Sequence, residues 1–393
     1  MEVQPRRHAA RPAPISDAGE HRLLELLRTE IEQSGPLTFA RFMRLALYEP
    51  GLGYYASSAE RPTRQGDFLT APELHPIYGH TLARRLHEMW QRLGGPADFT
   101  LREYGAGSGA LVIALLDGLE RLASPLAQRL RYQPLDLPAQ TSLITQRLAA
   151  CGYGAVVQPA IGPLVGCVLA NEFVDALPVH RVEARGGRLH ELYVDWSGGA
   201  LVERVGEPSS AALADWFRQA GVELADGQRA EVNLALFDWL AEVSANLERG
   251  YLLVIDYGAE PAELYGTRRR LGTLRAFRDQ HVSANVLAGV GRQDLTAHVD
   301  LAALRRAAQQ AGLALVGQDS QANFLLGAGL EDALSDEREG LGDSWAELLT
   351  LRSSVARLLD PRALGGYAVV LLGRGVAAEP ALRGLSGRLP VRA

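Results

Sequence analysis

The sequence is poor in cysteine and contains no apolar run long enough to cross a membrane. Only two of its 393 residues are cysteines, and Cys151 and Cys167 lie in separate apolar segments without metal-ligand spacing. We therefore expect packed thiols in a reducing compartment, which is the cytoplasm, or the mitochondrion if the source is eukaryotic. The longest apolar runs, residues 251–255 and 367–372, have the length of a strand, whereas a membrane-spanning helix needs about 20 residues.

The sequence also lacks a long basic tract, an internal repeat and a secretory signal. The formal net charge of −6 argues against a protein that binds nucleic acid by electrostatic attraction, so we expect no nucleic-acid partner. The first sixteen residues contain three arginines and three prolines but no apolar core, which excludes a signal peptide. We predict a disordered leader over residues 1–19.

The most informative segment is a glycine-rich turn between a predicted strand and a predicted helix. Gly105, Gly107 and Gly109 follow the apolar run 101–104, and the helix begins at Ala110. The pattern also fits a dinucleotide fingerprint, so NAD is one alternative, and a turn without a cofactor is another. Glu103 favours S-adenosyl-L-methionine, because a carboxylate there would repel a pyrophosphate but suits the ammonium group of the methionine moiety.

Two further segments are candidates for the same site. Asp136 ends a short strand-like run after the glycine turn, where an acidic residue would bind the ribose hydroxyls of the cofactor; a turn aspartate beside Pro138 is the alternative. Residues 66–73, in a long irregular stretch rich in glycine, proline and tyrosine, contain two carboxylates and a hydroxyl. Long ordered loops are often functional, although Thr70 could simply cap the following helix.

Periodicity predicts an α/β fold with a parallel sheet covered on both faces. The N-terminal part reads as helices at residues 20–31, 38–47 and 77–93, and residues 300–310 form another amphipathic helix. Expected strands lie at residues 101–104, 133–136, 155–158, 166–170, 251–256 and 313–316, with an antiparallel last strand at 367–372. Gly186-Gly187, between two strand-like runs, predicts an antiparallel insertion after the fourth strand, whose tips we expect to overhang the cofactor site and select the substrate.

A second group of chemical residues follows the predicted strand at residues 166–170. In open α/β sheets the ligand lies beyond the carboxyl ends of the strands, so Asn171 and Glu172 should face the cofactor. Glu172 and Asp175 could hold a guanidinium group and accept the proton released when it is methylated. The alternative is a loop whose carboxylates cap the next helix.

Several motifs occur in one order and together resemble the MidA-type, mitochondrial complex I assembly-factor family of protein arginine methyltransferases. The resemblance spans roughly residues 37–372. It rests on the segments Gly66–Glu73, Glu103–Gly109, Asn171–Pro178, Ile255–Gly258, Asp294–Asp300 and Gln321–Leu326. It implies a class I, Rossmann-like methyltransferase sheet, S-adenosyl-L-methionine as cofactor and methylation of an arginine in a protein. For the mitochondrial members that protein is a complex I subunit, so a respiratory-complex subunit is the expected partner here.

The predicted site and domains follow from these motifs. We predict Glu172, Asp175 and His298 as catalytic, although a lone histidine is more often a packing residue. The predicted cofactor-binding residues are Asp67, Phe68, Thr70, Glu103, Gly105, Ala106, Gly107, Ser108, Asp136, Leu137 and Asn171. The expected domains are an N-terminal helical region with a cofactor or substrate loop (20–98), a methyltransferase domain (99–376) with the insertion at about 178–245, and a tail (377–393).

Three functions stay open on this basis. The first is protein arginine methylation, the second is methylation of a small molecule or another nucleophile, and the third is a non-catalytic assembly factor that uses the cofactor only for structure. A dehydrogenase is a distant fourth. No metal site is expected, and a homodimer is left open.

Overall fold

The computed structural model describes residues 17–57, 70–278, 281–283, 285–341, 344–377 and 381–385. The predicted cofactor residues Asp67 and Phe68 and the leader residues 1–16 lie outside these ranges. The rest of the predicted leader is different from the expectation, because helix α1 (Asp17–Ser34) already begins at Asp17.

A six-stranded sheet forms the centre of the molecule, with strand order β15-β16-β9-β4-β2-β3. Four neighbouring strands are parallel: β3, β2, β4 and β9; β16 runs antiparallel between β9 and β15, as the sequence predicted for the last strand. The bounds are β2 (Phe99–Tyr104), β3 (Leu130–Leu135), β4 (Leu164–Asn171), β9 (Leu247–Asp256), β15 (Ala314–Ser320) and β16 (Ala368–Arg374).

The strand expected at residues 155–158 is wrong. That segment holds a 3-10 turn, Gly154–Val156, and a single bridge between Val157 and Tyr132. The 3-10 turn occupies the first part of the segment, so only Val157 pairs with β3, and the Gln158 N–H donates to the Tyr132 carbonyl oxygen at 2.8 Å.

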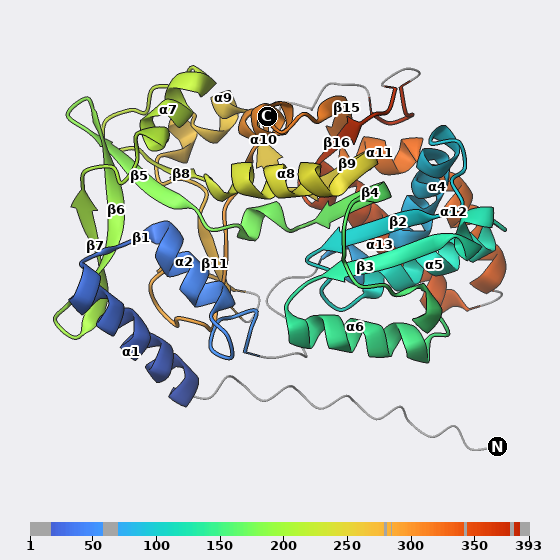
Figure 1. The fold of residues 1–393 in the computed structure, drawn as a ribbon, viewed down its shortest axis with the longest axis horizontal. Helices are drawn as coiled ribbons and strands as arrows, with labels where there is room; N and C mark the ends of the chain where they lie inside the picture. The colour runs from blue at the N-terminus through green and yellow to red at the C-terminus, as the bar shows by residue number, and fades with distance from the viewer. Residues whose placement is uncertain are drawn as a thin grey trace.

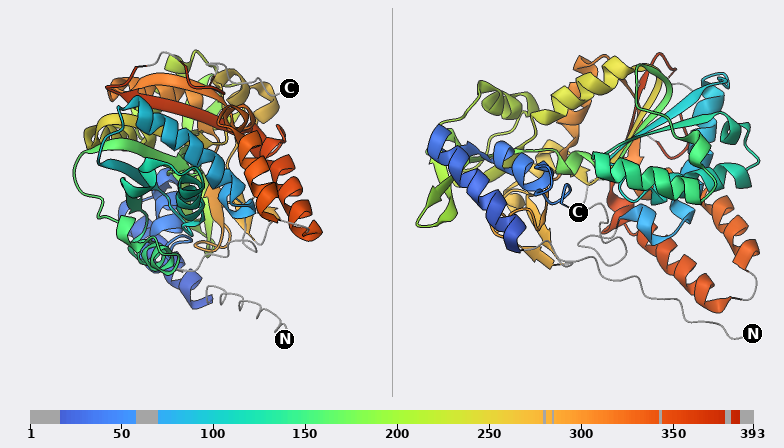
Figure 2. Two further views of the ribbon diagram at one scale, coloured as in Figure 1. Left: turned by 90° about the vertical axis from the view of Figure 1, so that its right-hand side faces the viewer. Right: turned by 60° about the horizontal axis from the view of Figure 1, so that its bottom comes forward.

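Helices cover both faces of this sheet, as Figures 1 and 2 show. Alternate residues of β4 separate the two cores: Cys167 and Leu169 pack with α4 (Ile77–Arg92) and α5 (Ala110–Arg121), while Val168 and Ala170 pack with α8 and α10. The helices of the second face are α7 (Ala211–Ala220), α8 (Ala235–Asn246) and α10 (Leu301–Gln310), and those that extend the first core are α6 (Pro138–Ala150), α11 (Gln321–Gly327), α12 (Leu330–Leu341) and α13 (Trp345–Leu359). The insertion was expected at about residues 178–245, but its last part forms α8, which packs on the central sheet.

A second lobe lies beside the sheet, at the left of Figure 1. Its antiparallel sheet has the order β1-β6-β5-β8, with β7 on β6, and a separate antiparallel group has the order β12-β11-β13. The strands are β1 (Leu37–Thr38), β5 (His180–Arg185), β6 (Arg188–Ser197), β7 (Ala200–Gly206), β8 (Arg229–Val232), β11 (Arg275–Arg278), β12 (His281–Ser283) and β13 (Asp294–Thr296). Helices α1 and α2 (Phe39–Tyr48) share its core, so the N-terminal helices and the predicted insertion fold together.

The remaining short elements connect these layers. They are α3 (Ala71–Leu74), α9 (Pro261–Leu264), β10 (Gly258–Ala259), which pairs with β14 (Val299–Asp300), and short 3-10 turns. Part of the predicted tail is packed, because Leu382 and Leu385 are buried and Arg85 of α4 donates to the Arg383 carbonyl oxygen at 2.5 Å. No helix in the described ranges is long and apolar enough to cross a membrane.

Candidate functional site

The glycine-rich turn joins β2 to α5 at the carboxyl edge of the sheet. Gly105, Gly107 and Gly109 have φ of +66°, +56° and +77°, a region that favours glycine. At Gly105 a second restraint applies, because an added Cβ would lie 3.0 Å from the Phe173 ring. The turn therefore needs glycine for its backbone shape and, at Gly105, for close approach to the segment after β4.

Glu103 lies at the end of β2, two residues before this turn, with its side chain buried. The Tyr132 hydroxyl donates to Glu103 Oε2 at 2.6 Å. Burial, with a smaller contribution from the nearby Asp136 carboxylate, raises the Glu103 pKa to about 7. A bound ammonium group would favour the charged form, so this carboxyl suits the cationic end of S-adenosyl-L-methionine.

The end of β3 supports the same turn. Asp136 Oδ2 accepts from the Gly107 N–H at 2.9 Å, and Asp136 Oδ1 accepts from the Leu137 N–H at 2.7 Å. Arg147 of α6 donates to the Ser108 carbonyl oxygen at 2.9 Å. The predicted ribose-binding carboxylate is thus held against the glycine turn.

Glu172 begins the segment after β4 and has an unusual backbone for a non-glycine residue. Its φ is +50°, and its N–H donates to the Ile255 carbonyl oxygen at 2.8 Å. Asn171 Nδ2 and the Ala71 N–H each donate to Glu172 Oε1 at 3.2 Å. Within the described residues, Oε2 is buried without a hydrogen-bond partner.

The environment of Glu172 favours the protonated form of its carboxyl group. Burial, followed by the charge of Asp175, raises its pKa to about 8. Asn171, which orients Glu172, is itself fixed by the Tyr78 hydroxyl, which donates to Asn171 Oδ1 at 2.7 Å. The strained backbone and the fixed amide together aim one carboxylate at the cavity.

Asp175 lies one short turn further on. Burial and the neighbouring Asp256 carboxylate raise its pKa, and the Tyr257 hydroxyl donates to it. Asp256 accepts the N–H groups of Val174 and Asp175 at 2.9 and 3.2 Å, so it fixes the backbone of the turn from the end of β9. Asp175 Oδ1 is buried and, among the described residues, has no hydrogen-bond partner.

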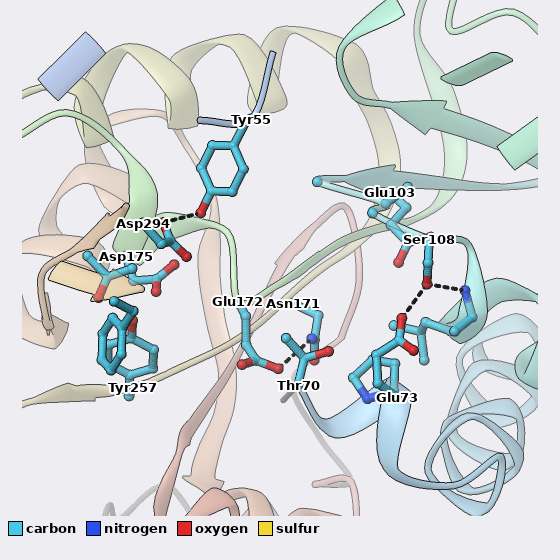
Figure 3. A pocket seen from close by; sticks show the side chains of 18 of the residues that line it. Tyr55, Thr70, Glu73, Glu103, Ser108, Asn171, Glu172, Asp175, Tyr257 and Asp294 are labelled. Carbon is cyan, nitrogen blue, oxygen red and sulfur yellow. Dashed lines mark hydrogen bonds between the residues drawn. The ribbon is translucent and has the colours of Figure 1, made fainter. Parts of the chain in front are cut away.

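Glu103, Glu172 and Asp175 line one cavity of about 180 Å³, shown in Figure 3. In that view Glu172 lies between Glu103 and Ser108 on one side and Asp175, Asp294 and Tyr257 on the other. The predicted residues that line it are Thr70, Glu103, Gly105, Ala106, Gly107, Ser108, Asn171, Glu172 and Asp175. Asp136 and Leu137 line an adjoining hollow of about 320 Å³ that also reaches Gly105 and Glu172.

Two sequence-based expectations fit this geometry poorly. His298 does not line either hollow: its Nδ1 lies 3.0 Å from Arg269 Nη1 and its ring packs edge-on against Tyr257 at 5.2 Å. Its catalytic role stays a prediction without a contact to the cavity. The antiparallel strands β5 to β7 contribute no lining residue, so the expectation that their tips overhang the site is wrong.

The structure adds residues that the sequence did not identify. Tyr55, Tyr257 and Asp294 line the cavity, and Glu73 also lines it while accepting a hydrogen bond from the Ser108 hydroxyl. Tyr257, Asp294 and Glu73 belong to motifs quoted above, so position within a motif was an available signal. Tyr55 carried none. In the described part of the chain no group of three or more potential ligands could hold a metal ion.

Comparisons with known proteins place the chain in a family. Residues 81–318 match the model of the Methyltransf_28 family, described as S-adenosyl-L-methionine-dependent methyltransferases. The human protein named protein arginine methyltransferase NDUFAF7, mitochondrial, is 30% identical over 340 residues, which cover 79% of this chain and 74% of that protein. The Drosophila melanogaster homologue of that name is 28% identical over 339 residues, covering 79% and 75%.

A solved structure is similar over nearly the whole chain. A Burkholderia thailandensis protein, crystallised with S-adenosyl-homocysteine bound, superposes with a TM-score of 0.84 at 30% sequence identity. The match covers 96% of this chain and 98% of that one. The lobe that carries α1, α2 and the antiparallel strands is therefore part of a shared architecture.

Proposed function

Because this chain belongs to the Methyltransf_28 family of S-adenosyl-L-methionine-dependent methyltransferases, we propose that its acidic cavity receives an arginine side chain of a protein for methylation. One observation carries the proposal. Glu172 has a buried carboxylate oxygen without a hydrogen-bond partner in the described residues, in the same cavity as the glycine turn. Such a group stays protonated unless a cation pairs with its ionised form, and a guanidinium group is a cation that can be methylated.

The described residues fit the cofactor. Glu103 would hold its ammonium group, the turn from Gly105 to Gly107 would lie against its methionine portion, and Asp136 would accept from its ribose hydroxyls. When bound, the cofactor supplies an electrophilic methyl group. We assign the sheet to the class I methyltransferases on this arrangement of strand ends.

The protein would then act on the acceptor in two ways. Glu172 would orient the planar guanidinium through its Oε2 and Asp175 through its Oδ1, which draws positive charge toward the nitrogens that do not react. As the reacting nitrogen forms its bond to carbon, it loses a proton, and Glu172 Oε2 would accept it. A pKa of about 8 makes that carboxylate a stronger base than an exposed glutamate.

The substrate is the next proposal. The relatives' printed names and the motif resemblance support a protein acceptor, and the resemblance supports a subunit of a respiratory complex. The domain limits at residues 99 and 377 and a cytoplasmic location remain predictions of the sequence, and a homodimer remains open. The cavity itself supports only the chemistry of the acceptor.

The test follows a labelled methyl group. The full chain, or its Glu172→Gln variant, is incubated with S-adenosyl-L-methionine carrying a tritiated methyl group and a membrane extract rich in respiratory complexes. We expect label in acid-hydrolysed protein as methylarginine with the wild-type chain and none above background with the variant. Label confined to extractable metabolites would support the small-molecule alternative, and equal methylarginine from both proteins would overturn the role of Glu172.

A non-catalytic assembly factor predicts a different result. It would bind S-adenosyl-homocysteine and show no label in protein or metabolites. Isothermal titration with S-adenosyl-homocysteine, run on both proteins, ensures that a lost signal is not a lost cofactor.

A further inference from the structure

Asp294 comes from a part of the chain that is distant in sequence from the glycine turn and from Glu172. It begins β13, which pairs with β11 so that Asp294 lies opposite Phe277. Asp294, Thr296 and Phe277 line the cavity, while Leu295 between them is buried in the core of the second lobe. The strand alternation therefore presents Asp294 to the cavity from the wall opposite the cofactor turn.

Tyr55 fixes this carboxylate from the N-terminal lobe. Its hydroxyl donates to Asp294 Oδ1 at 2.6 Å across 239 residues of sequence. The Tyr55 N–H donates to the Leu47 carbonyl oxygen at 2.8 Å, and its ring packs against Tyr48 at 5.5 Å. The turn before it requires glycine, because a Cβ at Gly53 would lie 2.6 Å from the Glu49 nitrogen. Tyr55 is thus held by backbone and by ring packing, and it can hold Asp294 in turn.

The carboxyl groups of Glu172, Asp175 and Asp294 lie close enough to influence one another. The Asp294 charge contributes to the raised pKa of Glu172 and to that of Asp175. Each of the three side chains is also oriented by a neighbour: Glu172 by Asn171, Asp175 by Tyr257, and Asp294 by Tyr55. A lysine ammonium offers three N–H donors on one compact charge, whereas a planar guanidinium offers five N–H donors along several edges.

We propose that Asp294, positioned by Tyr55, is a second binding residue for the acceptor, contacting the edge of the guanidinium that faces away from the glycine turn. This inference rests on the proposed function and adds a specificity determinant to it. With Glu172 on the side of the cofactor and Asp294 on the far side, the cavity would grip a planar cation from both ends. A neutral side chain of the same shape would offer no positive charge to either carboxylate.

The test uses two small probes that differ in charge but hardly in shape. Binding of Nα-acetyl-L-arginine methylamide and of its citrulline counterpart is measured by titration calorimetry on the full chain saturated with S-adenosyl-homocysteine. Asp294→Asn removes the charge, and Tyr55→Phe removes only the orienting hydroxyl. The matched control is Asp98→Asn, which changes an exposed aspartate just before the start of β2, at the end of that strand away from the glycine turn.

We expect the wild-type chain to prefer the arginine probe. Asp294→Asn should weaken binding of that probe about tenfold or more, Tyr55→Phe should weaken it less, and Asp98→Asn should leave it unchanged. Affinity for S-adenosyl-homocysteine should stay within about twofold in all three variants. In methylation assays, Tyr55→Phe should raise KM more than it lowers kcat, which a merely structural loss would not do.

Two outcomes overturn the inference, and they are distinguishable. A wild-type chain that prefers arginine over citrulline while Asp294→Asn keeps the same preference refutes the role of Asp294 alone. A wild-type chain without any preference for the arginine probe refutes the proposed function, and this inference with it. Should Asp294→Asn fail to fold, an unchanged affinity and KM in Tyr55→Phe would refute the pairing.

Discussion

Glu172→Gln should stabilise the ligand-free protein at alkaline pH while it removes activity. The Glu172 pKa rises from 4.5 to about 8 on folding, mainly because the carboxyl is buried. Between these pH values the unfolded chain releases a proton that the folded chain retains, so stability is fully present below pH 4.5 and is lost as pH rises toward 8. Each pH unit in that interval is worth about 1.4 kcal/mol, which gives about 5 kcal/mol in total.

The glutamine variant isolates this contribution. Its side-chain oxygen can still accept from Asn171 and from the Ala71 N–H, but nothing titrates. Urea unfolding followed by tryptophan fluorescence, without cofactor, at pH 5, 6, 7 and 8 gives the free energy of unfolding of both proteins. The difference in favour of Glu172→Gln should grow by about 3 to 4 kcal/mol from pH 5 to pH 8.

The control is Glu248→Gln, which changes an exposed glutamate of β9. Its difference from the wild-type chain should stay within about 0.5 kcal/mol and should not vary with pH. If the curves of the wild-type chain and Glu172→Gln run parallel over the whole range, Glu172 is not the buried, uncompensated acid described here. Glu172 would then not be a stronger base than an exposed glutamate.

Three further predictions concern the cofactor and the pH profile. The logarithm of kcat/KM should rise with pH and level off above about 8, since Glu172 must be ionised in the free enzyme; a flat profile from pH 6 to 9 contradicts this. Glu103→Gln should weaken S-adenosyl-homocysteine binding about 10- to 100-fold by calorimetry, because a buried charged contact is lost, and affinity within twofold of wild type would refute that contact. Gly105→Ala should lower the melting temperature and cofactor affinity more than Gly107→Ala does. Both have positive φ, but only at Gly105 does the new Cβ lie 3.0 Å from the Phe173 ring, so equal effects would rule out that steric explanation.

The central sheet could be predicted because its strands are buried on both faces. Such strands are continuous apolar runs, as at residues 251–256 and 367–372, and they are visible without any partner. The expectation at 155–158 failed because an apolar run says nothing about pairing, and a 3-10 turn at Gly154–Val156 leaves that segment only one bridge. Local hydrophobicity identifies segments that could form a strand, but it does not identify the strand with which each would pair.

The site was predictable on the side of the cofactor and much less so on the side of the acceptor. Glu103 lies near the end of β2, and Asp136 and Glu172 directly follow β3 and β4, so topology alone brings them to one edge. Tyr55 and Asp294 meet only through the packing of the N-terminal helices against β11 and β13, and no local pattern encodes a contact over 239 residues. His298 was predicted from its motif, yet it lies in the short segment between β13 and β14, and its ring packs edge-on against Tyr257.

The contact between Tyr55 and Asp294 makes the acceptor site impossible to separate from the N-terminal helices. A shortened chain that starts at α3 would retain α4, the glycine turn, Glu103, Asp136 and Glu172, and could be mistaken for an intact methyltransferase. It would lack Tyr55 as well as α1 and α2, which share a core with β11 and β13. Grafting the central sheet and its helices onto another protein would therefore transfer the proposed cofactor-binding residues without Tyr55, the residue that orients Asp294.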